Sequence, residues 1–255
     1  MLLGRDKESK IIKRLKEKNL LAGSYIFFGE SQVGKFTFAD EITRELEGNP
    51  FVCQERLIIR SGESKIGIDA IRAMKLFLRK RPVMSAFRTV IIKDAHKMTP
   101  EAQNAALKIV EEPPSYALII FITRGIDNIL PTLSSRLRRL YFPCVPKHDI
   151  ISWLVANHNV PEKEATHIAE ISFGAPGFAL QVIKEINAKK TKSFTIPKKF
   201  NSTEEYDEFM KKYLVKLYHD KNKNSVILKK VLRRIELSSK FNTNKKLQIQ
   251  SVFNF

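Results

Sequence analysis

A glycine-rich stretch near the N-terminus has the residue types and spacing of a phosphate-binding loop. It runs from Gly29 to Phe36 as GESQVGKF, which matches G-x-x-x-x-G-K and departs from the pattern at the next position. In a working loop, backbone N–H groups bind phosphate oxygens, the lysine reaches the outer phosphates, and a Ser or Thr hydroxyl holds magnesium. Phe36 has no hydroxyl, and Thr37 would point about 100° away around a helix. The stretch predicts a degenerate loop that keeps Gly29, Gly34 and Lys35.

A second pair of positions bears on the same chemistry. The apolar run Thr89–Ile92 is followed by Lys93 and Asp94. At the carboxyl end of such a strand, P-loop ATPases carry an aspartate for magnesium and then a glutamate that activates water. A lysine cannot coordinate a cation, so two magnesium ligands are absent. This argues against a self-sufficient ATPase, although residual nucleotide or phosphate binding through Lys35 stays open as an alternative.

The pair Ser135-Arg136 follows the next apolar run, Ala117–Thr123. An arginine suits contact with a phosphate because its guanidinium is always charged and makes planar, forked hydrogen bonds. The alternative is that Arg136 only belongs to a basic turn before a strand at Leu140–Phe142. Thr123, at the end of its run, is interpreted as an ordinary strand terminator.

The elements that must position these residues alternate between strand and helix. Short apolar runs predict the strands Ser24–Phe28, Phe51–Arg60, Thr89–Ile92, Ala117–Thr123 and Leu140–Phe142. The two central runs are too continuous to be half exposed, which is typical of a parallel sheet. Thr99 and Pro100 predict a helix start, and Pro113 ends that helix. The fold class is therefore α/β, with a P-loop-type parallel sheet.

Helical spacing dominates the two ends of the chain. Asp6–Leu20 predicts an amphipathic helix whose buried stripe would be Ile11, Ile12, Leu15 and Leu20. After Pro146 only helices are expected. We predict an α/β domain at 1–145, a three-helix lid at 146–188, a linker at 189–201 and a helical domain at 202–255.

Several segments together resemble a known family. DAHKMTPEAQNAALKIVEEPP, ALIIFIT and LPTLSSR resemble the AAA+ module of bacterial clamp-loader subunits. Degenerate ATPase motifs combined with a retained Ser-Ser-Arg resemble the delta-prime subunit family of DNA polymerase III. Gly177 stands where ATP-binding relatives carry a sensor arginine. The resemblance covers Leu2 to about Ile186, and more faintly 238–244.

The resemblance implies a stator-like subunit that does not turn over ATP. In the family, the arginine at the position of Arg136 reaches the nucleotide bound by a neighbouring subunit as an arginine finger, and Ser135 supports it. Expected partners are the clamp-loader ATPase subunits (gamma/tau), the delta subunit, the sliding clamp and primer-template DNA. The segment 202–255 would be the collar that joins subunits in a ring, and it is shorter than usual.

Other functions stay open at this point. The chain is alternatively an active gamma/tau-like ATPase subunit, although Phe36 and Lys93 oppose this. It is alternatively the clamp-opening delta subunit, which has no need of the Ser-Ser-Arg finger, or simply a basic DNA-binding module.

Composition limits the remaining classes. The 255 residues carry a net charge of +18, and 17 Lys and Arg against 6 Asp and Glu lie between Lys189 and Phe255. Such a segment attracts polyanions such as nucleic acid, or only solvates helix faces. Cys53 and Cys144 are far apart, and many family members carry a four-cysteine zinc module between Gly48 and Ile68 where this chain offers only Cys53. No zinc, other metal or resident cofactor is expected, and neither is a signal, an anchor or a membrane partner, so we predict a cytoplasmic protein.

Overall fold

The computed structural model of the chain describes residues 3–47, 55–62 and 65–187. The chain divides into two compact units, Met1–Gly177 and Phe178–Phe255. The predicted linker 189–201 and helical domain 202–255 lie outside the described residues. Within the described part, no helix has both the length and the apolar character needed to cross a membrane.

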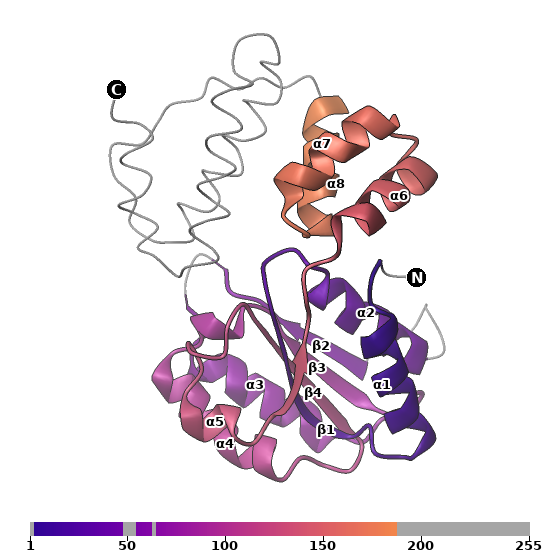
Figure 1. The fold of residues 1–255 in the computed structure, drawn as a ribbon. Helices are drawn as coiled ribbons and strands as arrows, with labels where there is room; N and C mark the ends of the chain where they lie inside the picture. The colour runs from indigo at the N-terminus through magenta and orange to yellow at the C-terminus, as the bar shows by residue number, and fades with distance from the viewer. Residues whose placement is uncertain (1–2, 48–54, 63–64, 188–255) are drawn as a thin grey trace, which may run out of the picture. The chain divides into compact units, whose positions relative to one another are not determined.

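A five-stranded parallel sheet forms the centre of the first unit (Figure 1). The strands are β1 (Gly23–Phe28), β2 (Arg56–Ile59), β3 (Arg88–Ile92), β4 (Ala117–Thr123) and β5 (Arg138–Tyr141), in the order β2-β3-β4-β1-β5. Every neighbouring pair is parallel, which confirms the predicted sheet. Because all strands run the same way, their carboxyl ends share one edge, where the predicted phosphate-binding loop begins.

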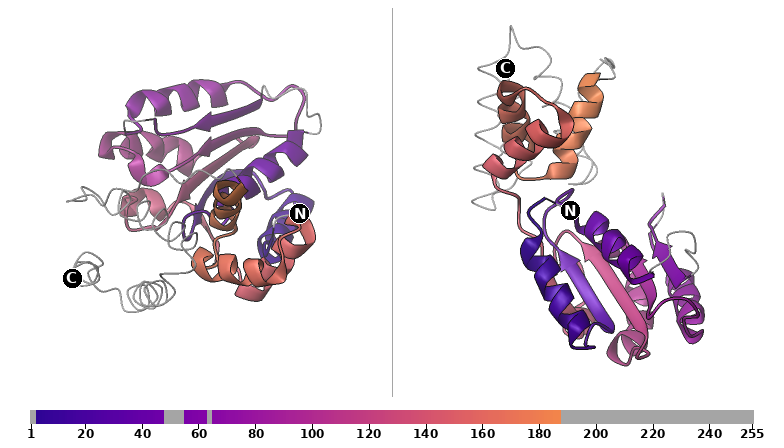
Figure 2. Two further views of the ribbon diagram at one scale, coloured as in Figure 1. Left: turned by 90° about the horizontal axis from the view of Figure 1, so that it is seen from above. Right: turned by 90° about the vertical axis from the view of Figure 1, so that its right-hand side faces the viewer.

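Helices cover the sheet and continue the chain beyond it. They are α1 (Asp6–Glu17), α2 (Lys35–Glu47), α3 (Ile68–Arg79), the 3₁₀ turn η2 (Ala95–Lys97), α4 (Pro100–Glu111), α5 (Pro131–Ser134), α6 (Lys147–His158), α7 (Glu162–Ser172) and α8 (Pro176–Asn187). In Figures 1 and 2, α1 and α2 lie on one face of the sheet, and α3 and α4 lie on the other. After the last strand, α6 packs against α7.

The core lies on both faces of the sheet. All seven residues of β4 are buried, as a central parallel strand requires. In β1, Ile26 belongs to the cluster shared with α3 and α4, whereas the next residue, Phe27, packs its ring against Phe38 of α2 and against Phe142. Successive residues of one strand therefore serve opposite layers.

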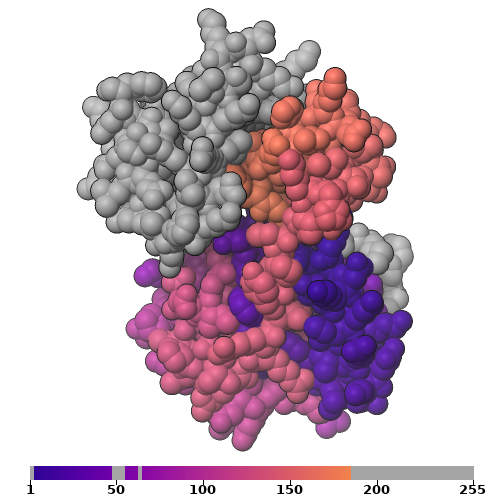
Figure 3. All heavy atoms as spheres, viewed as in Figure 1, coloured from indigo at the N-terminus to yellow at the C-terminus, as the bar shows by residue number. Residues whose placement is uncertain are grey.

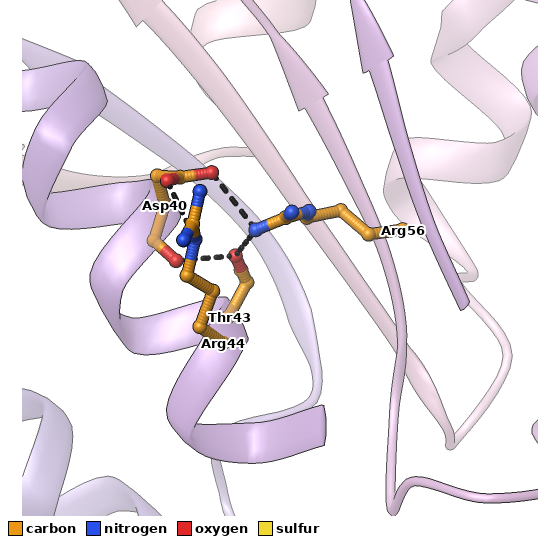
Figure 4. Close-up of polar contacts among 4 residues, drawn as sticks. All are labelled: Asp40, Thr43, Arg44 and Arg56. Carbon is orange, nitrogen blue, oxygen red and sulfur yellow. Dashed lines mark hydrogen bonds and ion pairs between the residues drawn. The ribbon is translucent and has the colours of Figure 1, made fainter. Parts of the chain in front are cut away.

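Polar contacts join α2 to the edge strand β2 (Figure 4). The Arg56 guanidinium donates to the Asp40 carboxylate at 2.8 Å and to the Thr43 hydroxyl at 3.3 Å. Asp40 also pairs with Arg44 at 2.9 Å, one turn further along α2. Only 8% of the Arg56 side chain is exposed, so this ion pair is largely shielded from solvent and fixes the helix against the strand.

The other edge of the sheet, β5, is open. Three of its four residues are exposed, and Tyr141 is 56% exposed. Figure 3 shows this segment at the surface, bordered by α1 on one side. Tyr141 packs on Phe28 with ring centroids 5.2 Å apart, so the edge is partly shielded by an aromatic contact between strands.

The predicted buried stripe of the first helix is wrong. Of its four members only Ile12 is buried, while Ile11 and Leu20 are 45% and 53% exposed. The helix ends at Glu17, so Leu20 is not on it, and its second buried position belongs to Glu8, which pairs with the buried Arg5 at 3.6 Å. A buried ion pair therefore replaces the expected apolar contact.

Candidate functional site

The loop that the sequence predicts to bind phosphate, Gly29–Phe36, lies between β1 and α2, and close packing requires its first glycine. Gly29 has φ +141°, and a Cβ at this position would collide with the carbonyl oxygen of Phe142. Its N–H donates to the carbonyl of Arg124 at 3.1 Å. Gly34 has φ +98° at the start of α2. Both glycines thus adopt backbone conformations that other residues rarely adopt, as the motif predicts.

Lys35 is buried and bound to its own loop. Its ammonium donates to the carbonyl oxygens of Gly29 at 2.6 Å and Glu30 at 2.5 Å. Burial lowers the pKa of Lys35 to about 8; Glu30 opposes this shift, and the nearby charges of Arg124 and Arg5 add to it. In a working P-loop the lysine at this position binds a phosphate. In this structure the Lys35 ammonium instead binds two backbone carbonyl oxygens of the loop.

Phe36 and Lys93, which stand where a P-loop ATPase would carry magnesium-binding side chains, contact each other. The Lys93 ammonium lies 5.3 Å from the centroid of the Phe36 ring, and the Arg60 guanidinium lies 5.2 Å from the same ring. Cations at this distance from an aromatic ring are attracted by its quadrupole. Two cations therefore lie close to the Phe36 ring, and Phe36 and Lys93 are the positions at which a P-loop ATPase would supply oxygen ligands.

Asp94, predicted at the position of the water-activating glutamate, forms a turn. It has φ 57° and ψ 48°, in the left-handed region, and its carbonyl accepts from the Lys97 N–H at 2.8 Å. Its negative charge is close enough to Lys35 to favour the protonated form of that lysine, although burial outweighs this contribution to the pKa. Asp94 therefore affects the loop through its charge.

Gly177 lies against the loop as well. Its N–H donates to the carbonyl of Gln32 at 3.0 Å, and a Cβ at this position would come within 2.9 Å of the same oxygen. No side chain fits here without displacing the loop. The structure thus brings together the loop, Lys93, Asp94 and Gly177, four features separated by up to about 150 residues in the sequence.

Arg5 is a site residue that the sequence reasoning missed. Its side chain is buried, and Nη2 donates to the carbonyl oxygens of Val33 in the loop at 2.6 Å and Pro143 at 3.0 Å. The guanidinium also lies 5.2 Å from the Phe142 ring. Burial lowers the pKa of Arg5, and Glu8 partly offsets this effect. An arginine beside a charged helix carries no signal in the sequence that distinguishes it from a solvent-facing residue.

Ser135 and Arg136 are held at the surface just after α5. The Arg136 Nε donates to a Glu111 carboxylate oxygen at 3.0 Å, and Nη1 donates to the Thr132 carbonyl at 2.8 Å. Ser135 donates to the same carbonyl at 3.2 Å. The Arg136 side chain is 38% exposed, and none of its contacts with described residues is to the phosphate-binding loop. The Thr123 hydroxyl is buried and donates to the Gly125 carbonyl at 2.8 Å, consistent with a strand terminator.

No metal centre is formed by the residues that the structure covers, since no group of three or more His, Cys, Asp or Glu side chains gathers there. The arrangement offers cations, backbone N–H groups and an exposed arginine. Cations and backbone N–H groups are the groups with which proteins contact phosphates.

The sheet order and the loop between β1 and α2 define a P-loop domain of the AAA+ class. Solved structures agree: a DNA polymerase III gamma subunit-related protein of Thermotoga maritima has a TM-score of 0.55 at 24% identity, covering 95% of this chain and 96% of that one. Cdc6p of Pyrobaculum aerophilum has a TM-score of 0.56 at 14% identity, covering 74% and 63%. At these identities the likeness concerns the fold.

The family follows from the sequence comparisons. Residues 4–146 match the family model described as DNA polymerase III, delta subunit, so the chain belongs to this family and is a delta-prime-like clamp-loader protein. It is 30% identical over 126 residues to DNA polymerase III subunit delta' of Escherichia coli (strain K12), covering 49% of this chain and 38% of that protein. It is also 30% identical over 182 residues to subunit gamma/tau of Mycoplasma pneumoniae, covering 65% and 26%. The chain thus spans well under half the length of these relatives.

Proposed function

We propose that this chain is a non-ATPase, stator-like delta-prime subunit of a DNA polymerase III clamp loader. In this proposal it supplies Arg136 in trans to nucleotide bound by an adjacent ATPase subunit, so that the sliding clamp is loaded on primed DNA. Its partners would be the gamma/tau and delta subunits, the clamp and primer-template DNA. A cytoplasmic location belongs to the proposal, because two separated cysteines suit a reducing compartment.

The observation that carries the proposal is the contact between Lys93 and the Phe36 ring. P-loop ATPases hold magnesium with a hydroxyl and an aspartate, and the metal neutralises charge that develops on the transferred phosphoryl group. Here those positions hold the Phe36 ring and the Lys93 ammonium, which form a cation–π contact with each other. Weak nucleotide binding through Lys35 is compatible with the proposal, whereas hydrolysis and a resident metal are not.

Arg136 supports the second half of the proposal. Its Nε and Nη1 donate to acceptors within the chain, and the side chain is partly exposed, so the Nη2 group can meet a partner's phosphate. A guanidinium supplied by a neighbour accelerates phosphoryl transfer by on the order of 10³-fold or more in well-studied cases. A subunit without its own hydrolysis can therefore still control the turnover of its neighbour.

The test is reconstitution with the ATPase and delta subunits, followed by DNA-stimulated hydrolysis and clamp loading. Arg136→Ala should lower the rate of ATP hydrolysis at the neighbouring site that Arg136 contacts by on the order of 10³-fold. The control is Arg139→Ala, which removes an exposed arginine on β5 and should leave the rate unchanged. An unchanged rate in Arg136→Ala would contradict the proposal.

A second candidate is an active gamma/tau-like ATPase subunit. It is favoured by the match to the Mycoplasma pneumoniae gamma/tau subunit, which covers 65% of this chain, and by the retained Gly29, Gly34 and Lys35. Titration of the isolated chain with ATP, with and without magnesium, discriminates the two. Magnesium-dependent hydrolysis by the isolated chain would establish the second candidate. In a separate binding measurement, tight binding of the clamp by the isolated chain would instead indicate a clamp-opening delta function.

A further inference from the structure

The contact between Glu111 and Arg136 joins the last residue of α4 to the turn after α5. One Glu111 carboxylate oxygen accepts from the Arg136 Nε at 3.0 Å, and the Thr132 carbonyl accepts from Nη1 at 2.8 Å. These two bonds engage two different nitrogens of the guanidinium, Nε and Nη1. The Nη2 group has no hydrogen-bond partner among the residues that the structure describes, so this group is left available to a partner.

The contact is exposed, and this decides what it can contribute. The Glu111 and Arg136 side chains are 55% and 38% exposed. An ion pair this accessible to solvent contributes little to folding stability. Its effect is orientation: two fixed acceptors, one at Nε and one at Nη1, select a narrow range of side-chain conformations for a long, flexible residue. Since guanidinium–carboxylate hydrogen bonds are strongly directional, the plane of the fork is set as well.

Both acceptors stand on a rigid frame. Glu111 ends α4, whose start is capped by the Thr99 side chain and whose Ala102, Ala106 and Val110 are buried. The buried Gln103 of the same helix donates to the Met98 carbonyl at 3.4 Å and accepts from the Leu130 N–H at 2.8 Å, directly before α5. One helix therefore fixes both the segment that carries Arg136 and the carboxylate that orients it.

We propose that Glu111 is a positioning residue for Arg136, which holds the guanidinium with its Nη edge toward an oxyanion of the neighbouring subunit's nucleotide. This inference rests on the proposed function, and it adds a residue that acts through the arginine without touching the nucleotide. If Glu111 were instead a restraint that must release Arg136 before the arginine acts, Glu111→Ala would raise the rate of hydrolysis. A displacement of about 1 Å in a group that stabilises a transition state can cost on the order of 10²-fold in rate.

The experiment uses the full chain reconstituted with its ATPase partners, and it compares Glu111→Ala with Glu112→Ala, a matched removal of the exposed neighbouring carboxylate. The part of the DNA-stimulated rate that Arg136→Ala abolishes is taken as the finger-dependent rate. Glu111→Ala should lower this rate at saturating ATP by about tenfold or more, with the KM for ATP unchanged. Glu111→Gln, whose amide oxygen still accepts from Nε, should restore part of it. The thermal midpoint of the isolated chain should not change.

A double variant separates positioning from an indirect structural effect. Glu111→Ala combined with Arg136→Ala should be no slower than Arg136→Ala alone, because Glu111 acts only through the arginine. If Arg136→Ala itself has no effect, the proposed function fails. If Arg136→Ala is slow while Glu111→Ala matches Glu112→Ala or is faster than wild type, the finger stands and the positioning role is wrong.

Discussion

At the residue scale, the side chains of Lys35, Phe36 and Lys93 all make contacts within the chain. Phe36 has no hydroxyl and Lys93 has no carboxylate, and the Lys93 ammonium lies over the Phe36 ring, 5.3 Å from its centroid. Lys35 is likewise bound by the carbonyls of its own loop. Lys35, Phe36 and Lys93 thus each contact another group of the chain.

Restoring both ligand positions tests this interpretation. Phe36→Thr combined with Lys93→Asp would return a hydroxyl and a carboxylate to the loop edge and remove the ring–cation contact. We expect the double variant to bind ATP at least about tenfold more tightly with magnesium than with EDTA, since both ligands are needed to hold the ion. Each single variant should change by less than about threefold. A fluorescent-nucleotide titration measures this, and no magnesium effect in the double variant would refute it.

The buried Lys35 predicts a pH dependence of stability. Burial lowers its pKa from 10.5 to about 8, so the fold disfavours the charged form relative to the unfolded chain. The resulting loss of stability is complete below about pH 8 and disappears as the pH rises toward 10.5. Between about pH 7.5 and 9.5, wild type should gain about 1–2 kcal/mol relative to Lys35→Met. Urea unfolding measures the difference, with the exposed Lys13→Met as control; parallel curves for wild type and Lys35→Met would contradict it.

At the element scale, the bounds of strand β4 and helix α4 follow from local sequence. The predicted strand Ala117–Thr123 is confirmed residue for residue as β4, because an uninterrupted apolar run fits only a strand buried on both faces. Thr99 caps α4 by accepting the Ala102 N–H, and the helix ends at Glu111 before Pro113, as predicted. Where one residue type decides a boundary, local sequence is sufficient to predict it.

Other boundaries depend on partners far away in the chain. The apolar pattern predicts the last strand at Leu140–Phe142, whereas the strand runs from Arg138 to Tyr141. Its pairing is set by the backbone of β1, where Tyr25 pairs with Arg138, and not by its own apolar residues. The site behaves in the same way: the loop is recognisable in the sequence, whereas the contact of Lys93 with Phe36 and the burial of Arg5 arise only when β1, β3 and β5 meet.

The junction between the loop and the last strand gives an element-level prediction. A Cβ at Gly29 would collide with the backbone oxygen of Phe142, and the residue already has φ +141°. Gly29→Ala should lower the free energy of unfolding by about 3 kcal/mol or more. Gly62→Ala is the matched control, because nothing lies within 4 Å of its added Cβ, and it should change stability by less than about 0.5 kcal/mol. Urea unfolding measures both free energies. Equal losses in the two variants would show that the contact with the Phe142 oxygen is not the reason for a glycine at position 29.

At the scale of the whole molecule, charge is distributed unevenly along the chain. The net charge is +18, and 17 basic against 6 acidic residues lie from Lys189 onward, outside the described residues. Such a segment either binds the phosphates of DNA directly or only contributes to a general attraction. The two possibilities differ in whether the position of the charges matters or only their number.

Two five-lysine variants of equal charge decide between them. One changes Lys189, Lys190, Lys192, Lys198 and Lys199 to Gln, and the other changes the exposed Lys7, Lys10, Lys13, Lys16 and Lys18 on and just beyond α1. If the basic segment contacts DNA, its variant should bind primer-template DNA more weakly than the α1 variant at low salt. Its log–log salt slope should also fall by about 0.9 for each phosphate that is no longer neutralised. Fluorescence anisotropy across a salt series measures both quantities. Equal weakening in the two variants would mean that only net charge attracts DNA, and that the basic segment does not bind its phosphates directly.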